Sequence, residues 1–314
     1  MNFYSSRDYS IDLLNRFLKD KIFKYDADRN FDYESEENSA VSKLSPYISH
    51  GILKETEVLR RVLANSKITQ LASDAVTVLN PKRKEPLLFL CEHAGAEIPG
   101  PWKTLGLPPA FFDTHFAYDK GAAEVTNFLA HFVNATAILS RYSRIFLDYN
   151  RYPDDWEKIR PDLGGIPVPG NTKISEVERN LRYAIAEEPV KSTILRHLPG
   201  LKAIISIHSF SPVMAGKFRD VDIGILWKQN TDFVKQMTKA ISKHSKLLDL
   251  RVAENEPYDW RFLNAYTLEA HAIANGLPCC VIEINSKLLS DPKNTQQIGQ
   301  FLGDALKTVI VSNF

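Results

Sequence analysis

From Pro86 onward, short apolar runs alternate with amphipathic segments. The runs have strand length and little polar character, as buried strands do, and they read "LLFLCE", "ATAILS", "RIFLDY", "AIISIH", "DIGILW" and "CCVIEI". The segments between them carry apolar residues at helical spacing, and they read "KGAAEVTNFLAHFVN", "SEVERNLRYAI", "TDFVKQMTKAISKHS" and "TLEAHAIAN". This alternation predicts an α/β fold, a three-layer sandwich with a mixed, mostly parallel central sheet.

The first 80 residues have a different pattern. Helical periodicity runs through "SIDLLNRFLKDKIF", "GILKETEVLRRVLANS" and "ITQLASDAVTVL", with an acidic, aspartate-rich segment at 26–37. No linker rich in glycine, serine or proline separates Leu79 from Pro86. We therefore expect residues 1–80 to form a helical N-terminal extension packed on an α/β domain spanning residues 81–314.

Composition limits the classes of partner. The chain of 314 residues is 44% hydrophobic, which is enough for a substantial core, and its net charge of +1 provides no general attraction to nucleic acid or an anionic membrane. No apolar run has the length of a spanning helix, and the first residues lack the order of a signal peptide, so we expect a cytoplasmic protein. The cysteines, Cys91, Cys279 and Cys280, lie in strand-like runs and are expected to be buried free thiols.

Polar side chains follow the predicted strands. They are Glu92 and His93, then Asp148, Asn150 and Arg151, then His208, then Glu283. Because the carboxyl ends of parallel strands meet at one edge, these groups are expected in one crevice, where imidazoles and carboxylates suit a hydrolytic zinc site. A lone histidine or glutamate at a strand end is more often structural, and no HExxH or paired CxxC motif is present. The segment "NRYPDDWEKIRPDLGGIPVPGN" is too long for a simple connection and is expected to shape the site.

Several ordered motifs resemble the N-formylglutamate amidohydrolase family over residues 86–289. They are "CEHAGAEIP", "SRIFLDYNR", "IPVPGN", "SIHSFSPV", "NEPY" and "VIEIN". A fainter likeness extends to zinc carboxypeptidases and aspartoacylase-like deacylases, which implies a zinc-exopeptidase-like (phosphorylase/hydrolase-like) fold. The resemblance implies that His93 and His208 bind Zn²⁺, that Asn150 and Arg151 bind the substrate carboxylate, and that Glu283 is the base.

The third metal ligand is less clear from the motifs. Carboxypeptidase-like enzymes place an acidic ligand three residues after the first histidine, but that position is Ala96 here. Glu92, Glu97 and Asp119 are the alternatives, and Asp119 is favoured because its "D-x-G-A" segment resembles a motif of the family. A second departure is Lys191, which stands where relatives carry the histidine of a Pro-aromatic-His triplet.

Roles can be assigned to the remaining polar groups. Glu283 would act as general base and then acid, and Arg151 with Asn150 would hold a substrate carboxylate. Arg144 would polarise the scissile carbonyl, neutralise a second carboxylate, or simply pair with Asp148. Asn171 and Arg182 are weaker candidates for lining the pocket.

The leading hypothesis is a zinc-dependent amidohydrolase. It would remove an N-formyl or other short N-acyl group from an acidic amino acid such as N-formylglutamate. The alternatives are a zinc carboxypeptidase or deacylase on the same scaffold, and a non-catalytic member that only binds a ligand. The expected partner is a small-molecule N-acyl amino acid, with no nucleic acid or membrane, and the sequence leaves the oligomeric state open.

Overall fold

The computed structural model describes residues 6–22, 41–63 and 65–313. Within these ranges a seven-stranded sheet has the order β1-β3-β2-β6-β11-β9-β10. Its strands are β1 (Val76–Leu79), β2 (Leu87–Cys91), β3 (Thr136–Ser140), β6 (Ala203–Phe210), β9 (Ile223–Leu226), β10 (Val252–Glu254) and β11 (Cys279–Asn285). The neighbours β3, β2, β6 and β11 run parallel to one another, whereas β1 is antiparallel to β3 and β9 is antiparallel to β11. The edge strand β10 is parallel to β9. The predicted mixed, mostly parallel sheet is confirmed.

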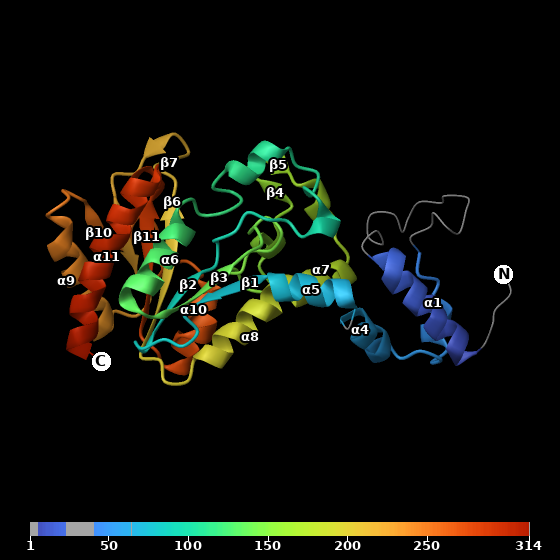
Figure 1. Cartoon of the computed structure of the whole chain (residues 1–314). Helices are drawn as coiled ribbons and strands as arrows, with labels where there is room; N and C mark the ends of the chain where they lie inside the picture. Colours follow the sequence, from blue (N-terminus) through green and yellow to red (C-terminus); the bar gives the residue numbers. More distant parts are fainter. Residues whose placement is uncertain (1–5, 23–40, 64, 314) are drawn as a thin grey trace.

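Helices cover both faces of the sheet (Figure 1). One face packs against α6 (Ala122–Val133), α9 (Asp232–Ser245) and α11 (Pro292–Asn313). The other packs against α5 (Ser66–Asp74), α7 (Glu176–Arg182), α8 (Glu188–His197) and α10 (Tyr266–His271), with the π-helical turn η6 (Tyr183–Glu187) joining α7 to α8. Alternate strand residues face opposite cores, as Leu88 and Phe89 do. The three-layer α/β sandwich is therefore confirmed.

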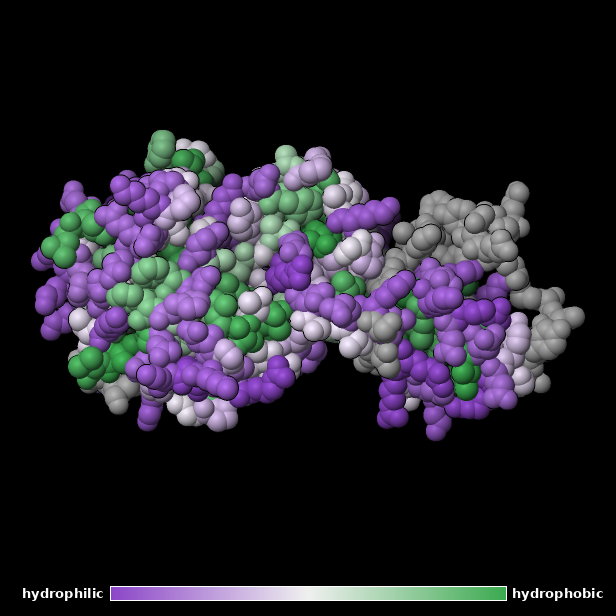
Figure 2. All heavy atoms as spheres, in the orientation of Figure 1, coloured by the Kyte–Doolittle hydropathy of each residue, from purple (hydrophilic) through white to green (hydrophobic). Residues whose placement is uncertain are grey.

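Short elements complete the described part of the chain. The hairpins are β4 (Asp162–Leu163) with β5 (Ile166–Pro167), and β7 (Val213–Met214) with β8 (Lys217–Phe218). The single turns are η2 (Gly100–Trp102), η3 (Pro109–Asp113), η4 (Trp156–Ile159), η5 (Pro169–Asn171), η7 (Ile273–Asn275) and η8 (Ser286–Leu289). Both hairpins expose hydrophobic side chains, including Ile166, Met214 and Phe218, and such groups gather there on the surface in Figure 2.

Local sequence signals account for the helix boundaries. The Ser175 side chain accepts a hydrogen bond from the backbone N–H of Glu178 at the start of α7, and Thr231 caps α9 in the same way through Val234. Asn134 ends α6 in the left-handed region, at φ 60°. The cysteines Cys91, Cys279 and Cys280 are buried and free, as predicted. No helix in the described ranges is both long and apolar enough to cross a membrane.

The segment "RIFLDY" is not a strand, contrary to the prediction. It folds as turns, in which the backbone N–H of Phe146 bonds to the carbonyl of Ser143. Its apolar side chains are nevertheless buried, with Phe146 fully inaccessible. A continuous apolar run shows that a segment is buried, but it does not distinguish a sheet strand from a packed loop.

The N-terminal region also departs from the helical prediction at its end. The helices α1 (Arg7–Asp20), α3 (Ser45–Ser49), α4 (Glu55–Leu63) and α5 are present. However, Val76–Leu79 forms β1 and pairs with β3 at the sheet edge, because its β-branched residues suit a half-buried strand. Figure 1 shows α1 at the far end of the molecule from the sheet, while α5 packs beside η6, α8 and β1. The acidic segment 26–37 lies outside the described residues, and the division at residue 80 stays a prediction.

Candidate functional site

A cavity of about 480 Å³ lies over the carboxyl ends of β2, β6 and β11. His93 directly follows β2, and His208 and Glu283 are register partners on the neighbouring strands β6 and β11. Glu283 shares a strand face with Val281, two residues earlier, and both line the cavity. The backbone N–H of Asp119 bonds to the carbonyl of His93 at 2.9 Å, which brings the segment before α6 to the same edge.

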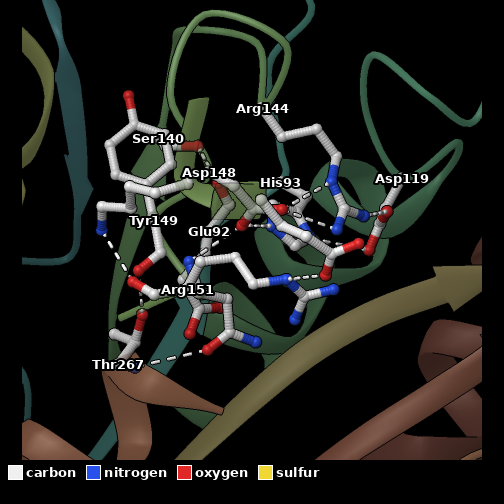
Figure 3. A network of polar contacts seen from close by, with 12 residues as sticks. Glu92, His93, Asp119, Ser140, Arg144, Asp148, Tyr149, Arg151 and Thr267 are labelled. Atoms are coloured by element: carbon white, nitrogen blue, oxygen red, sulfur yellow. Dashed lines mark hydrogen bonds and ion pairs between the residues drawn. The ribbon is translucent and has the colours of Figure 1, made fainter. Parts of the chain in front are cut away.

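Three side chains converge as a metal site would require. His93, Asp119 and His208 are buried, and one ligand atom from each lies within 4.8 Å of the others. Oδ2 of Asp119 is 2.8 Å from Nδ1 of His208 and 3.6 Å from Nδ1 of His93. Figure 3 shows Asp119 beside His93 at the end of this network. This arrangement supports the predicted ligand set.

The outer nitrogen of each ring also faces a carboxylate. Nε2 of His93 is hydrogen-bonded to Oδ1 of Asp148 at 2.8 Å, and Nε2 of His208 lies 3.2 Å from Oε2 of Glu92. Glu92 in turn accepts a hydrogen bond from the Ser206 hydroxyl. Carboxylates behind ligating histidines fix the ring orientation and raise ligand basicity. The two rings are thereby held with Nδ1 toward Asp119.

The alternative carboxylates occupy other positions. Glu97 is exposed and pairs with Arg141 at 2.9 Å, away from the histidines. Glu92 is buried behind His208 and is not part of the converging set. Among the carboxylates that the sequence left open, Asp119 is the one that meets both histidines.

The residues present fit a zinc ion. Within the described ranges, Nδ1 of His93 and Oδ1 of Asp119 are buried atoms without a hydrogen-bond partner. A buried polar atom left unpaired is costly, so such atoms usually have a ligand or water as partner. Two imidazoles and one carboxylate are also the donor set of catalytic zinc sites.

Charge and burial set the proton affinities of the carboxyl groups. Burial alone would raise the pKa of Asp119, but the adjacent His93 and His208 hold it well below its usual range. Asp148 is likewise buried, and Arg144 keeps its pKa well below the usual range. By contrast, burial raises the pKa of Glu283 to about 7, against the lowering effect of His208. Glu283 is the carboxyl suited to take up and release a proton near neutral pH.

The polar wall of the cavity comes from the segment that follows Ser143. Arg144 donates to Oδ2 of Asp148 through Nε at 3.1 Å and Nη2 at 2.8 Å. Oδ1 of Asn150 accepts from the backbone N–H of Thr267 at 3.3 Å, and Nε of Arg151 lies 2.9 Å from Glu157. Arg144, Asn150 and Arg151 all line the cavity, and Figure 3 shows Arg144 and Arg151 near Asp148.

Asn171 and Arg182 do not line the cavity, so their predicted substrate-binding role is wrong. Asn171 donates to the carbonyl of Ile145 at 2.9 Å, and Arg182 donates to the carbonyl of Phe146 at 3.1 Å. Because residues 144–149 lie outside the sheet, the carbonyls of Ile145 and Phe146 lack strand partners, and these two side chains supply their hydrogen bonds. Arg182 also pairs with Glu178 at 2.8 Å and is fully buried.

Some cavity residues escaped prediction. His115 lies 3.7 Å from Oδ1 of Asp119, and burial lowers its pKa to about 4. Tyr258 lines the cavity, and its hydroxyl accepts a hydrogen bond from Arg219 at 2.9 Å. It is the last residue of the family-like "NEPY" motif, which could have identified it as a site residue. Arg160 also lines the cavity; it lies in the long proline-rich segment that was expected to shape the site, but no pattern singled out this residue.

Lys191, the departure from the family pattern, pairs with Glu188 on α8 and does not line the cavity.

Comparison with known proteins agrees with this geometry. The model of the N-formylglutamate amidohydrolase family matches residues 85–290. The chain belongs to this family. No curated protein matches the sequence significantly.

Two solved structures are similar over most of their length. Gene product Atu2144 from Agrobacterium tumefaciens is 31% identical, covers 77% of this chain and 97% of its own, and has a TM-score of 0.71. An N-formylglutamate amidohydrolase from Ralstonia eutropha JMP134 is 15% identical, covers 75% of this chain and 97% of its own, and has a TM-score of 0.55. The second likeness concerns the fold alone. Family membership supports a hydrolase that acts on amide bonds.

Proposed function

We propose that this protein is a zinc-dependent amidohydrolase. It removes an N-formyl or other short N-acyl group from an acidic amino acid, with N-formylglutamate as the first candidate substrate. The observation that carries the proposal is the convergence of His93, Asp119 and His208 beside Glu283 in one cavity. The cytoplasmic location expected from the sequence stays a prediction.

The chain's own residues divide the work of hydrolysis. Arg151 binds the substrate carboxylate through its planar fork, and Asn150 adds a hydrogen bond. Glu283 takes a proton from the attacking water and returns it to the leaving nitrogen as the amide C–N bond breaks, so the products are the carboxylic acid and the free amino acid. Asp148 and Glu92 keep the histidine rings oriented.

His93, Asp119 and His208 would hold the metal. A bound zinc ion supplies a Lewis acid that polarises the amide carbonyl and lowers the pKa of water. Arg144, beside Asp148 at the cavity wall, adds positive charge near the carbonyl oxygen. The intact constellation argues against a member that only binds ligands, because a binding protein has no need of the elevated pKa of Glu283.

Metal analysis and an assay test the proposal together. The purified protein should contain about one zinc per chain, and formate release from N-formyl-L-glutamate should be lost with a chelator and return with zinc. His208→Ala should lose both metal and activity, while His131→Ala, at an exposed position on α6, should keep both. Full zinc content in His208→Ala would contradict the ligand assignment. Zinc-loaded enzyme that hydrolyses neither N-formyl nor N-acetyl amino acids would contradict the function.

A further inference from the structure

A glutamate of the protein lies between two arginines that line the cavity. Oε2 of Glu157 is 2.9 Å from Nε of Arg151, and Oε1 is 3.3 Å from Nη1 of Arg160. All three side chains line the cavity and remain partly exposed, at 26% for Arg151 and Glu157 and 30% for Arg160. One carboxylate therefore bridges two guanidinium groups at the wall where a substrate carboxylate is proposed to bind.

We propose that Arg151 and Arg160 form a two-cation site for the two carboxylates of an acidic substrate, and that Glu157 occupies this site until substrate displaces it. Arg151 binds the α-carboxylate, and Arg160 binds the carboxylate of the substrate side chain. This inference rests on the proposed function, because it assigns a second anchor to the same acidic substrate. Arg160 and Glu157 are then specificity-determining residues.

Unused donors on both arginines support this assignment. In the described ranges, Nε of Arg151 and Nε of Arg160 are buried atoms without a properly directed hydrogen bond, although Glu157 is close. A guanidinium that makes two parallel hydrogen bonds to a carboxylate is more favourable than the contacts seen here. Arg160 is also held over the Trp156 ring, with its guanidinium carbon 5.3 Å from the ring centroid. Its position is thus maintained when Glu157 leaves.

Arg144 is not available for the second carboxylate. It makes two hydrogen bonds to Asp148, and Asp148 in turn orients His93. If Arg144 bound the substrate instead, the buried carboxylate of Asp148 would lose its cation, which is strongly unfavourable. Arg160 has no such partner among the described residues apart from Glu157 and the Trp156 ring. Of the arginines that line the cavity, Arg151 and Arg160 are therefore the pair open to an anion.

Charge balance requires Glu157 to move. With Glu157 in place, its carboxylate would face the second substrate carboxylate at close range, and such like-charge pairs are unfavourable. Glu157 lies on η4, whose next residue, Lys158, is fully buried and bonded to Glu187 and to the carbonyl of Arg151. The backbone is therefore anchored, and the partly exposed Glu157 side chain can rotate into solvent without it. The carboxylates of glutamate are joined by a short carbon chain, so they can reach two guanidinium groups that share one carboxylate here.

Binding of two matched probes tests the inference without turnover. Glutarate carries two carboxylates, and pentanoate replaces one of them with a methyl group. In calorimetric titrations of the zinc-loaded protein, Glu157→Gln should bind glutarate about 10-fold or more tighter than wild type, with a smaller gain for pentanoate. Arg160→Gln should weaken glutarate about 10-fold or more and leave pentanoate within about twofold. Glu188→Gln, which removes a matched i,i+3 ion pair outside the cavity, should change neither.

Opposite results would overturn the inference. If Glu157→Gln weakens glutarate, Glu157 supports Arg151 and does not compete with the ligand. If Arg160→Gln changes both probes equally or neither, Arg160 is not the second anchor. In turnover, Arg160→Gln should raise KM for N-formyl-L-glutamate and largely keep kcat. A wild-type enzyme that cleaves no N-acyl amino acid would refute the proposed function, and the titrations would still decide the role of the two arginines.

Discussion

Nε2 of His208 lies 3.2 Å from Oε2 of Glu92, while Nδ1 of the same ring lies 2.8 Å from Oδ2 of Asp119. His93 repeats the relationship with Asp148 on its outer side. Each imidazole is therefore placed between an outer carboxylate and the shared Asp119. Such outer partners orient metal-binding histidines and make them better ligands. In the proposed zinc site, Glu92 and Asp148 would therefore support the histidines from outside, without touching the ion.

Glu92→Gln should weaken zinc binding by about 10- to 100-fold. The amide keeps the size of the side chain and can still accept from the Ser206 hydroxyl, but it loses the charge beside His208. Competition with a chromophoric chelator measures the affinity, and circular dichroism checks that the fold is retained. Glu97→Gln, at an exposed ion pair, is the control and should bind zinc like wild type. Equal affinities for both variants would show that Glu92 has no influence on the metal site.

Glu283→Gln should lower kcat by about 10²- to 10⁴-fold, the usual contribution of a general base. Glutamine preserves the size of the group but cannot accept the proton of water. Metal content should stay at the wild-type value, because Glu283 is not part of the converging His93–Asp119–His208 set. Steady-state kinetics with N-formyl-L-glutamate measures the effect. A loss of less than about fivefold would exclude the role of base.

Arg151→Lys should show the opposite kinetic signature. Lysine keeps the charge but not the planar fork, so KM should rise while kcat changes less, if the carboxylate is held equally in the ground and transition states. The same assay compares the two variants. Similar, mild losses in both would mean that neither residue has the role proposed for it.

The sheet was predictable because its strands are continuous apolar runs. "LLFLCE", "AIISIH" and "CCVIEI" correspond to β2, β6 and β11, the three strands that deliver His93, His208 and Glu283. The edge strand β1 was assigned to a helix, since Val76–Leu79 follows α5 after a single residue and its short pattern suits both structures. "RIFLDY" failed for the opposite reason, because burial in a packed loop leaves the same apolar run as burial in a sheet.

Motifs predicted the centre of the site better than its wall. The residues that converge in the site either directly follow strands or lie in family-like motifs, so their place in the sequence indicated that they would meet at the carboxyl edge of the sheet. Asn171 also lies in such a motif, but its amide satisfies the carbonyls of Ile145 and Arg160 instead of facing the cavity. Glu157 and Arg160 lie in a long irregular segment, where neither periodicity nor spacing shows which side chains face inward. Only the folded geometry reveals that they meet Arg151.

Arg182→Met should destabilise the protein by about 3–5 kcal/mol, as expected when one partner of a buried ion pair is removed. The substitution leaves Glu178 without its cation and the carbonyls of Phe146 and Gly170 without their donor. Urea unfolding followed by circular dichroism measures the change. Arg196→Met, at an exposed position on α8, is the matched control and should shift stability by less than about 0.5 kcal/mol. If Arg182→Met left stability unchanged and raised KM, the result would show that Arg182 binds substrate and is not a structural residue.

Two shortened chains test which part of the N-terminal region the core needs for stability: α1, α3 and α4, or α5 and β1. A chain that starts at Asn65 keeps α5 and β1, and we expect it to remain folded. A chain that starts at Lys82 lacks the pairing of β1 with β3 and the bond from the Tyr142 hydroxyl to the carbonyl of Leu71. It also loses Ile68, which is buried against the core.

The Lys82 chain should therefore expose the β3 edge, aggregate more readily, and unfold roughly 5 °C or more below the Asn65 chain. Differential scanning calorimetry and light scattering on both chains measure these effects. If the Lys82 chain matches the whole protein in stability and solubility, the predicted packing of residues 1–80 on the core is wrong. If the Asn65 chain is as unstable as the Lys82 chain, the core depends on α1, α3 and α4 as well, despite the distance between α1 and the sheet in Figure 1.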